Sequence, residues 1–341
     1  MDLSIIVPVY NSGAYLRRTV GLLQTQEAVE YEIILVDDGS TDGSPRICDE
    51  IAAKADNVRV IHIQNSGPGH ARNEGIRIAQ GRYLAFCDSD DCPGQNMYGQ
   101  LLSILEEKAV DHVICDIYSE RDHKAFGFPW RRGDILFSGD GVVSGLMASM
   151  LGNPSDNDMS QPVWGSSVRG IYVKDIVMRH GVLFPEDIRF AEDLVFNIRY
   201  LKNIRSCYVV DKALYRYTLN QESLMNSHVK YNVNTFPERV RLVEYIEAEL
   251  DGLSPCDELR SRFQTSQRCY FIESVGNAAR AIKSEGYRYA YIEIRTIVRH
   301  ACVRRAFARY DAKSAKKRLS YGLVRNGRAW LLLLYYAVRL R

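Results

Sequence analysis

Short apolar runs alternate with helix-like segments over the first 120 residues, and this alternation constrains the fold more strongly than any other feature of the chain. After the first run, Leu16, Val20 and Leu23 recur at the i, i+4, i+7 spacing of a helix face. The pattern predicts right-handed βαβ units and a mostly parallel sheet covered by helices on both faces. The expected strands are 3–10, 32–38, 58–63, 83–88 and 112–118, and expected helices are 44–55, 70–80 and 97–108.

The pattern loosens after Phe126, where "GFPWRRGD" and "GNPSDNDMSQP" are typical of long loops. Further along, "CYVVD" and "ALYRYT" predict two short strands, and helical periodicity dominates from Phe236 onward. We therefore expect an α/β domain over 1–225, divided near residue 120 into two halves (1–120 and 121–225), followed by a helical region over 226–341. The later helices are expected at 140–151, 191–203, 237–250, 257–284, 287–310 and 313–338, with breaks at Gly252 and Gly286.

The net charge of +2 conceals a strongly basic C-terminal end. From Arg299 to Arg341 there are twelve Lys/Arg and one acid, which gives +11 and leaves −9 for the rest of the chain. This asymmetry indicates contact with an anionic surface. The apolar run Ala329–Val338 is too short to span a bilayer, which takes about 20 residues. We expect this tail either to lie on a membrane as an amphipathic anchor or to pack as a last core or dimer helix.

The eight cysteines are scattered and include no C-x-x-C pair, which argues against a zinc ribbon or a thioredoxin-like site. Such cysteine usage is typical of a reducing compartment. The chain starts directly with a strand-like run, and no signal peptide is recognisable. These observations predict a cytoplasmic location.

Polar and acidic residues follow each of the first four expected strands, as "PVYNSG", "DDGSTDGS", "NSGPGHARN" and "DSDD". Ligands of open parallel sheets bind at this carboxyl edge, so the sequence predicts a site there. Neither a G-x-G-x-x-G turn nor a G-x-x-x-x-G-K-[ST] loop is present. A bound diphosphate would therefore need a divalent cation held by carboxylates, such as Mg²⁺ or Mn²⁺. Taken alone, the D-x-D also fits a turn or a helix cap.

Several segments in register resemble the nucleotide-sugar domain of inverting family 2 glycosyltransferases, which have the GT-A fold. The segments are "SIIVPVYNSGAYLRRTVGLLQTQ", "YEIILVDDGSTDGS" and "SGPGHARNEGIRIAQGRYLAFCDSDD", and the likeness continues in "FPEDIRFAEDLVFN" and "ALYRYTLNQESLM". It covers residues 1 to about 225 and is closest to members that act in bacterial polysaccharide synthesis. The resemblance makes 1–120 the nucleotide-sugar-binding half and 121–225 the acceptor half.

The resemblance assigns the donor site to four groups of residues. The turn made by Pro8, Val9, Tyr10 and Asn11 would line the nucleotide base. Asp38 would accept a hydrogen bond from uracil, whereas Asp37 is expected to hold its own turn. Arg72 would reach the nucleotide or its diphosphate, and Asn73 either assists it or pins the loop. Asp88, Ser89 and Asp90 form the D-x-D, in which Asp90 ligates the metal, Asp88 contacts the ribose or a metal-bound water, and Asp91 orients the loop.

On the acceptor side, the resemblance identifies Asp193 as the catalytic base, with Glu192 binding the acceptor or supporting the base. A carboxylate at a helix N-terminus stays ionised, which suits a base. Trp164 resembles the family's acceptor-side tryptophan. The lysine that commonly follows it is replaced by Ser166, so Arg169 or Lys174 is a candidate substitute. Displacement by a single base implies inversion at the anomeric carbon.

The resulting hypothesis is a hexosyltransferase-like enzyme dependent on Mn²⁺ or Mg²⁺. It would move a sugar from a UDP-sugar to a polysaccharide or lipid-linked oligosaccharide at the inner face of the membrane, with peripheral contact through the tail. The alternatives are a nucleotidyltransferase, which would need a glycine- and lysine-rich loop after the first strand, and a catalytically silent carbohydrate-binding or scaffold partner, which would not need its acids. The pattern also allows a homodimer through the helical region, and nucleic acid is not an expected partner.

Overall fold

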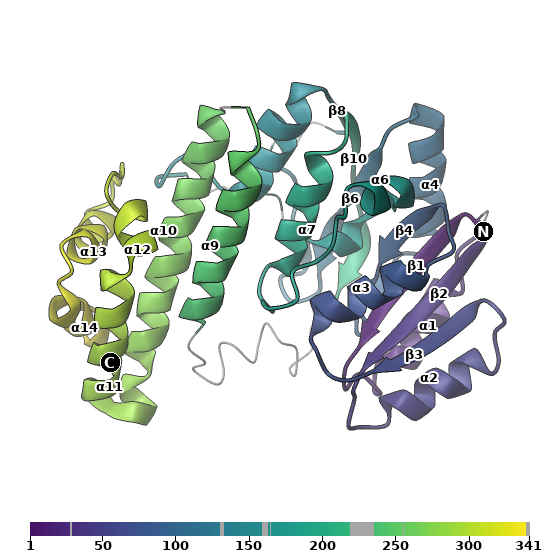
Figure 1. Cartoon of the computed structure of the whole chain (residues 1–341), viewed down its shortest axis with the longest axis horizontal. Helices are drawn as coiled ribbons and strands as arrows, with labels where there is room; N and C mark the ends of the chain where they lie inside the picture. Colours follow the sequence, from purple (N-terminus) through teal and green to yellow (C-terminus); the bar gives the residue numbers. More distant parts are fainter. Residues whose placement is uncertain are drawn as a thin grey trace. The chain divides into compact units, whose positions relative to one another are not determined.

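The computed structural model describes residues 1–27, 29–129, 133–158, 163, 165–218, 235–254 and 256–338. The chain divides into two compact units, an α/β unit (Met1–Met150 and Val163–Leu219) and a helical unit (Leu151–Pro162 and Asn220–Arg341) (Figure 1). The predicted boundary at residue 225 lies outside the described residues. Residues 151–158, expected within the α/β domain, group with the helices instead, because their contacts run to α10 (Asp257–Arg280), as in the bond from Arg262 to the carbonyl of Gly152.

The expected α/β architecture is confirmed, with a mostly parallel sheet in the order β3-β2-β1-β4-β9-β6-β10-β5. Its first part follows the sequence pattern closely. The strands are β1 (Leu3–Val9), β2 (Tyr31–Asp38), β3 (Val58–Ile63), β4 (Tyr83–Phe86) and β6 (His112–Ser119), and the helices are α1 (Leu16–Leu23), α2 (Ser44–Ala52), α3 (Pro68–Ile78) and α4 (Met97–Lys108).

Helix α3 lies unusually close to β1. A Cβ atom added at Gly75 would lie 2.4 Å from a methyl carbon of Ile6, a separation that real structures do not tolerate. The glycine therefore permits a close approach between helix and sheet. This approach brings the residues of α3, Arg72 among them, toward the carboxyl edge of the strands.

One strand in the middle of the sheet was not expected from the sequence. β9 (Gly170–Val173) lies between β4 and β6 and is antiparallel to both. At four residues it is too short to show a clear period of two. Gly170 is required there, because an added Cβ would lie 2.7 Å from the carbonyl oxygen of Val113.

The two short strands expected near residues 207–218 form a single strand instead, β10 (Ser206–Tyr217). Its pairing with β6 is irregular between Val210 and Tyr215, and this irregularity breaks the alternation that sequence reasoning relies on.

The remaining elements of the α/β unit are β5 (Cys92–Pro93), β7 (Lys124–Ala125), β8 (Ile135–Ser138), the π-helical η1 (Val142–Met147), α5 (Ala148–Leu151), the 3₁₀-helical η2 (Ser167–Arg169), α6 (Lys174–Arg179) and α7 (Glu192–Leu201).

A buried aromatic cluster fixes α7 on the sheet. Phe184 and Phe196 stack with ring centroids 4.0 Å apart, and Phe86 meets both rings edge-on at 5.1 and 5.4 Å. Tyr172 of β9 closes the cluster at 5.6 Å from Phe86. Aromatic pairs of this kind contribute about 0.5–1.5 kcal/mol each beyond their burial. The first turn of α7 is thereby held near the end of β4.

The helical unit consists of α9 (Phe236–Asp251), α10, α11 (Ile282–Arg299), α12 (Ala301–Ala306), α13 (Ala315–Arg325) and α14 (Ala329–Ala337). The break expected at Gly286 is confirmed, because this residue has a non-helical backbone with φ of 85° inside α11. The helix predicted over 287–310 is interrupted at His300, between the end of α11 and the start of α12. The helix predicted over 313–338 is two helices separated near Gly327, which has φ of 63°. Among the described helices, none is long and apolar enough to cross a membrane.

Candidate active site

Arg72 connects the end of β4 to the start of α7. Its Nη2 donates to Oδ1 of Asp88 at 2.8 Å, its Nη1 donates to Oε1 of Glu192 at 3.0 Å, and the same Nη1 lies 3.5 Å from Oδ1 of Asp193. The guanidinium also lies over the ring of Phe184. We refer to Asp88, Glu192 and Asp193 around Arg72 as the carboxylate cluster. Together with Arg72, it joins four residues that are up to 121 positions apart in the sequence.

Burial and mutual repulsion dominate the electrostatics of the carboxylate cluster. Burial, with repulsion from Asp193, raises the pKa of Glu192 to about 7 despite the opposing charge of Arg72. Burial raises the pKa of Asp88 to about 6, with Arg72 opposing and Asp193 and Asp90 adding repulsion. Although burial disfavours the charge of Arg72, the three carboxylates raise its pKa above the usual range. The cluster therefore carries more negative charge than one arginine neutralises.

Asp193 is held by donors on both of its carboxylate oxygens. Ser167 donates its backbone N–H to Oδ2 at 3.1 Å and its hydroxyl to Oδ1 at 2.9 Å, and the hydroxyl of Ser166 donates to Oδ2 at 3.4 Å. Ser167 is fully buried in η2. Sequence reasoning missed this residue, since a serine beside a short strand gives no signal of its own. Ser166, noted as standing where the family has lysine, contacts the expected base.

The rest of the D-x-D loop is anchored on the loop before α1 and on the end of β10. The hydroxyl of Ser89 donates to that of Ser12 at 2.6 Å. Asp91 is buried and accepts bonds from the Tyr215 hydroxyl at 2.8 Å and the Thr218 N–H at 2.9 Å. Burial, with repulsion from its acidic neighbours, raises the pKa of Asp91 well above its usual value. These contacts support the predicted loop-orienting role for Asp91.

Asp90 is placed differently from Asp91. It is half-buried, and its backbone carbonyl accepts a bond from the exposed Arg18 at 2.7 Å. With Asp88, whose side chain is 34% exposed, it supplies the oxygen ligands that Mg²⁺ and Mn²⁺ prefer. The described residues contain no preassembled group of three or more metal-ligating side chains. The raised pKa of Asp88, caused first by burial and then by repulsion from Asp193 and Asp90, nevertheless fits a cation, which would offset both effects.

The turn predicted to line the nucleotide base is held in place by the loop after β2. Asn11 has φ of 48°, and its Oδ1 accepts the N–H of Thr41 at 2.8 Å. Tyr10 is 48% exposed and available to a flat ligand, and Pro8 is half-buried. The expectation that the Val9 side chain lines the base is wrong. Its side chain is fully buried because it ends β1 within the core, so it offers only backbone to a ligand.

Asp37 and Asp38 at the end of β2 both hold loops. Asp38 accepts the backbone N–H of Ser66 at 2.7 Å and that of Gly67 at 2.9 Å, one on each oxygen. Asp37 accepts the N–H of Ser40 at 3.2 Å and lies 2.8 Å from Nδ1 of His62. Each oxygen of Asp38 keeps a lone pair, so hydrogen bonding to uracil stays a prediction alongside the observed loop contacts.

The other acceptor-side expectations have mixed outcomes. Trp164 lies outside the described residues. Arg169 is buried, donates from Nε to the carbonyl of Cys115 at 2.8 Å and lies 3.5 Å from Asp116, so it is a core residue and does not substitute for the missing lysine. Lys174 contacts the carbonyl of Ala79, at the opposite end of β9 from η2.

Asn73, which follows Arg72, has a clear structural role. Its Nδ2 donates to the carbonyl of Phe184 at 3.0 Å, and its Oδ1 accepts the N–H of the same residue at 2.9 Å. These two bonds hold the segment that leads to α7. They agree with the expectation that Asn73 pins a loop.

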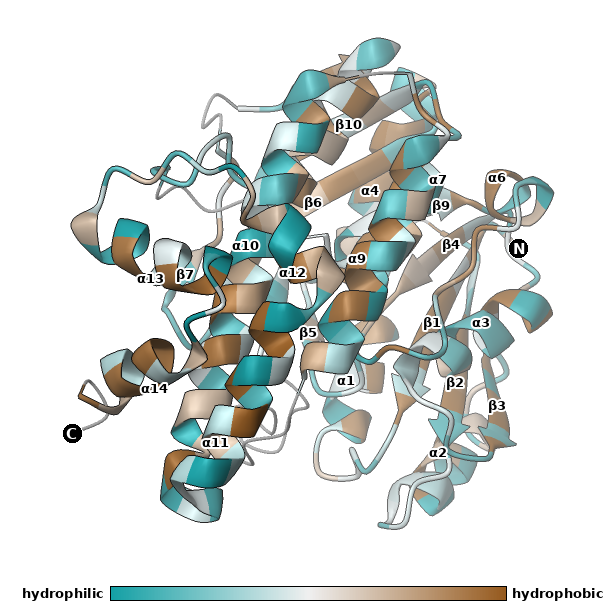
Figure 2. Cartoon of the chain, turned by 60° about the vertical axis from the view of Figure 1, so that its left-hand side comes forward, coloured by the Kyte–Doolittle hydropathy of each residue, from teal (hydrophilic) through white to brown (hydrophobic). Residues whose placement is uncertain are grey.

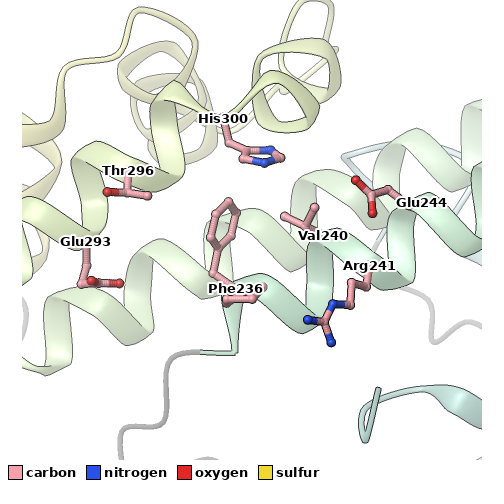
Figure 3. Close-up of a pocket in the computed structure, with 8 residues that line it drawn as sticks. Phe236, Val240, Arg241, Glu244, Glu293, Thr296 and His300 are labelled. Carbon is pink, nitrogen blue, oxygen red and sulfur yellow. The ribbon is translucent and has the colours of Figure 1, made fainter. Parts of the chain in front are cut away.

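The helical unit has a pocket of its own, of about 430 Å³, beside α9 and α11. Figure 3 shows Phe236, Val240 and His300 around it, with Arg241 and Glu244 alongside. The rings of Phe236 and His300 meet edge-on at 5.4 Å. The pocket contains none of the residues that the sequence assigned to the site.

Residues 4–143 match the family model described as Glycosyl transferase family 2. An uncharacterized glycosyltransferase, EpsJ of Bacillus subtilis (strain 168), is 33% identical over 222 residues, which is 65% of this chain and 62% of EpsJ. Another, YibD of Escherichia coli (strain K12), is 31% identical over 234 residues, or 68% of this chain and 65% of YibD. The aligned part thus spans slightly less than two thirds of each of these relatives.

Among solved structures, a 1–349 fragment of Staphylococcus aureus TarS in complex with UDP-GlcNAc matches with a TM-score of 0.70 at 20% identity. The match covers 99% of this chain and 91% of the fragment. At that identity the likeness establishes the fold, and the matched segment 4–143 includes the strand-end motifs of the donor side. Residues 4–143 therefore form a glycosyltransferase family 2 domain, and the chain has the GT-A fold.

Proposed function

We propose that the chain transfers a sugar, with inversion, from a UDP-sugar to a hydroxyl group of a polysaccharide or lipid-linked oligosaccharide. The single observation that carries this proposal is the carboxylate cluster. It places Asp193, oriented by Ser167, next to Asp88 of the D-x-D through their shared partner Arg72. A base and a diphosphate-binding motif thus lie on one edge of the sheet.

In this mechanism Asp193 takes the proton of the acceptor hydroxyl as its oxygen bonds to the anomeric carbon. The bond from that carbon to the diphosphate breaks, and its electron pair leaves with UDP. Because attack and departure occur on opposite faces of the carbon, an α-linked donor gives a β-linked product. The backbone N–H and the hydroxyl of Ser167 hold the Asp193 carboxylate in one orientation, which a positioned base requires.

Asp90 and Asp88 would hold Mn²⁺ or Mg²⁺, which would stabilise the negative charge of the departing diphosphate. Arg72 takes a different part from the one expected. Its buried guanidinium is engaged by three carboxylates, so we assign it to positioning them rather than to reaching the diphosphate. A mannosyltransferase from Pyrobaculum calidifontis, solved with GDP-Man and Mn²⁺, matches with a TM-score of 0.55, so metal use has precedent in this fold.

The choice of donor and acceptor class rests on similar proteins. The TarS fragment binds UDP-GlcNAc, which favours a UDP-sugar here. A relative from Bacillus spizizenii, 32% identical over 209 residues, is a poly(ribitol-phosphate) beta-glucosyltransferase. It favours a polymeric glycan acceptor. The competing hypothesis of a silent carbohydrate-binding partner does not account for a buried, repelling carboxylate cluster, whose assembly costs stability.

We also propose that the C-terminal tail makes a peripheral membrane contact. On α14, Trp330 is 55% and Leu334 48% exposed, and Val338 follows at 75%, within a segment rich in Lys and Arg. Figure 2 shows the apolar colouring of α14. Because Leu332 of the same helix is buried, point variants test this better than deletion. Trp330→Ser with Leu334→Ser should weaken binding to phosphatidylglycerol vesicles, and unchanged binding would refute the anchor.

The test of the main proposal is a panel of nucleotide-sugars, including UDP-GlcNAc, UDP-glucose and GDP-mannose, with Mn²⁺ or Mg²⁺. Slow hydrolysis and transfer are measured. We expect turnover with a UDP-sugar, and Asp193→Asn should bind UDP normally but lose transfer by about 10²–10⁴-fold. The exposed Asp140→Asn is the matched control and should behave as wild type. Absence of binding and turnover with every UDP-sugar would overturn the proposal.

A further inference from the structure

A second hollow in the helical unit, of about 960 Å³, lies among α10, α13 and α14. Its lining differs in kind from that of the pocket in Figure 3. It combines several lysines and an arginine with a group of tyrosines. We refer to it as the basic cavity.

The positive charge of the basic cavity is not neutralised by the protein. Arg280, Lys313, Lys316 and Lys317 line it, and none of the four forms an ion pair with an acid in the described part of the chain. Lys317 instead contacts a backbone carbonyl, that of Asp156. Four cations that converge on one concavity repel each other, which is unfavourable unless an anion enters.

The two acids in the lining are already committed. Asp156 is buried and accepts from Nε of Arg268 at 2.9 Å. Glu273, on the next stretch of α10, lies 3.1 Å from Nη2 of Arg239. Since each acid faces its own arginine, neither offsets the charge of the four cations. The cavity therefore presents a net positive field to a ligand.

The placement of the lysines on α13 adds to this imbalance. The first turn of α13 contains no acidic residue, and Lys316 and Lys317 occupy it. Positive side chains at a helix N-terminus oppose the helix dipole by about 0.3–1 kcal/mol each. A bound anion would reverse the sign of this interaction. Without a bound anion, the two lysines interact unfavourably with the dipole of α13.

The tyrosines indicate what accompanies the anion. Tyr321 is buried, and its hydroxyl lies 3.4 Å from Oδ1 of Asp156, so the floor of the cavity is fixed. Tyr335 and Tyr336 meet edge-on with ring centroids 5.2 Å apart. Aromatic rings pack against the apolar faces of sugars and polyols, while lysine binds phosphate as a point charge.

We propose that the basic cavity binds a phosphate ester carried by a sugar or polyol, such as the phosphodiester of a charged glycan. A concave site with tyrosine walls fits a discrete group of this size better than the flat surface of an anionic bilayer. The proposal concerns binding alone and does not depend on Asp193 acting as a base. Its failure and the failure of the proposed transfer are therefore separate results.

The test is the binding of glucose 1-phosphate, compared with glucose, by isothermal titration calorimetry without added metal. Lys313→Gln combined with Lys316→Gln is the informative variant, because both residues are exposed and their hydrogen bonds to Asn157 and Ser320 are made by the backbone. We expect glucose 1-phosphate to bind, glucose not to, and the double variant to bind at least about 10-fold more weakly. Lys54→Gln, at an exposed lysine of the α/β unit, is the control for the loss of a surface lysine outside the cavity.

The donor site also recognises phosphate, and Asp90→Asn separates the two sites. Glucose 1-phosphate binding that persists in Asp90→Asn but falls in the double lysine variant supports the proposal. Equal binding by the double variant and wild type overturns it. Binding to phosphatidylglycerol vesicles that is lost in the double variant, with no glucose 1-phosphate binding, also overturns it in favour of a lipid surface.

Cys269 gives a local readout, because it lines the basic cavity and is exposed. Glucose 1-phosphate should slow its alkylation by iodoacetamide, measured by peptide mass spectrometry. Cys256, at the N-terminus of α10, serves as the internal control and should react at an unchanged rate. Equal protection of both cysteines, or of neither, would contradict binding in the cavity.

Discussion

The acids at the end of β2 and those at the end of β4 look alike in the sequence but do different work in the structure. Asp37 and Asp38 each accept hydrogen bonds from nearby loops, and Asp37 also meets His62. Asp88 instead crowds against acids from α7 around one arginine. Acids whose oxygens are satisfied by local donors build loops, whereas acids left with excess charge form a site that awaits a ligand.

Replacing Arg72 with Met tests the carboxylate cluster at the end of β4 and should have the largest effect on stability and transfer. Removing one partner of a buried ion pair costs about 3–5 kcal/mol, and transfer should fall by more than about 1,000-fold as the carboxylate cluster separates. We expect the loss in unfolding free energy to be greater at pH 7.5 than at pH 5. The folded-state pKa values, about 6 for Asp88 and about 7 for Glu192, lie above the ordinary values of 3.8 and 4.5. As pH rises from the ordinary values to the folded-state values, both groups lose protons more readily in the unfolded state, so each lowers the unfolding free energy over this range.

The matched control for Arg72→Met is Arg46→Met, which removes an exposed pair with Glu50 on α2. Urea unfolding at the two pH values measures both variants. If Arg72→Met is as stable and active as Arg46→Met, the carboxylate cluster is not held together by charge.

Asp90→Asn and Asp91→Asn sharpen the comparison within one loop. Asp90→Asn should weaken Mn²⁺-dependent UDP binding by about 100-fold or more, because metal ligation contributes several kcal/mol. Asp91→Asn should leave that affinity within a few fold, since Asp91 is buried, its pKa is raised, and Asn resembles its protonated form. Calorimetry with and without Mn²⁺ measures both. Equal losses in the two variants would show that the acids are not divided between metal and loop.

Ser167→Ala tests whether the base is positioned by its hydrogen bonds. Loss of one hydrogen bond to a charged group should lower kcat by about 10-fold and leave the KM for donor unchanged. The exposed Ser144→Ala is the control. A rise in the KM for donor alongside the fall in kcat would indicate a general structural effect instead.

His62→Gln tests the acids at the end of β2 and should have the smallest effect on stability. Hydrogen bonds to Asp37 and then to Asp49 raise its pKa. The protonated ring therefore stabilises the fold fully below its unfolded pKa of about 6.5, and this stabilisation is lost as pH rises through the higher folded value. Because the side chain is 43% exposed, we expect less than about 0.5 kcal/mol. The Tm of His62→Gln should approach that of wild type from pH 6 to pH 8.5, and a constant difference would argue against a charged bridge.

Much of the donor side was predictable because each motif directly follows a strand with a strong apolar signal. Asp88 and Asp90 come immediately after β4, and Asn11 after β1, so their meeting on one edge follows from parallel topology. The same reasoning failed for β9, which is too short for a period, and for the division of 313–338 into α13 and α14. In these two segments, the backbone geometry of glycine and the packing of neighbouring elements override the hydrophobic periodicity.

The sequence by itself determined the α/β architecture, the edge where the site lies and the identity of its acids, because these follow from periodicity and from residues adjacent to strands. Only the tertiary structure decided how the acids divide their work. It buried Val9, turned Arg72 into the centre of the carboxylate cluster and brought Ser167 to Asp193. Charge balance and hydrogen-bond satisfaction depend on partners distant in the chain, and no local pattern records them.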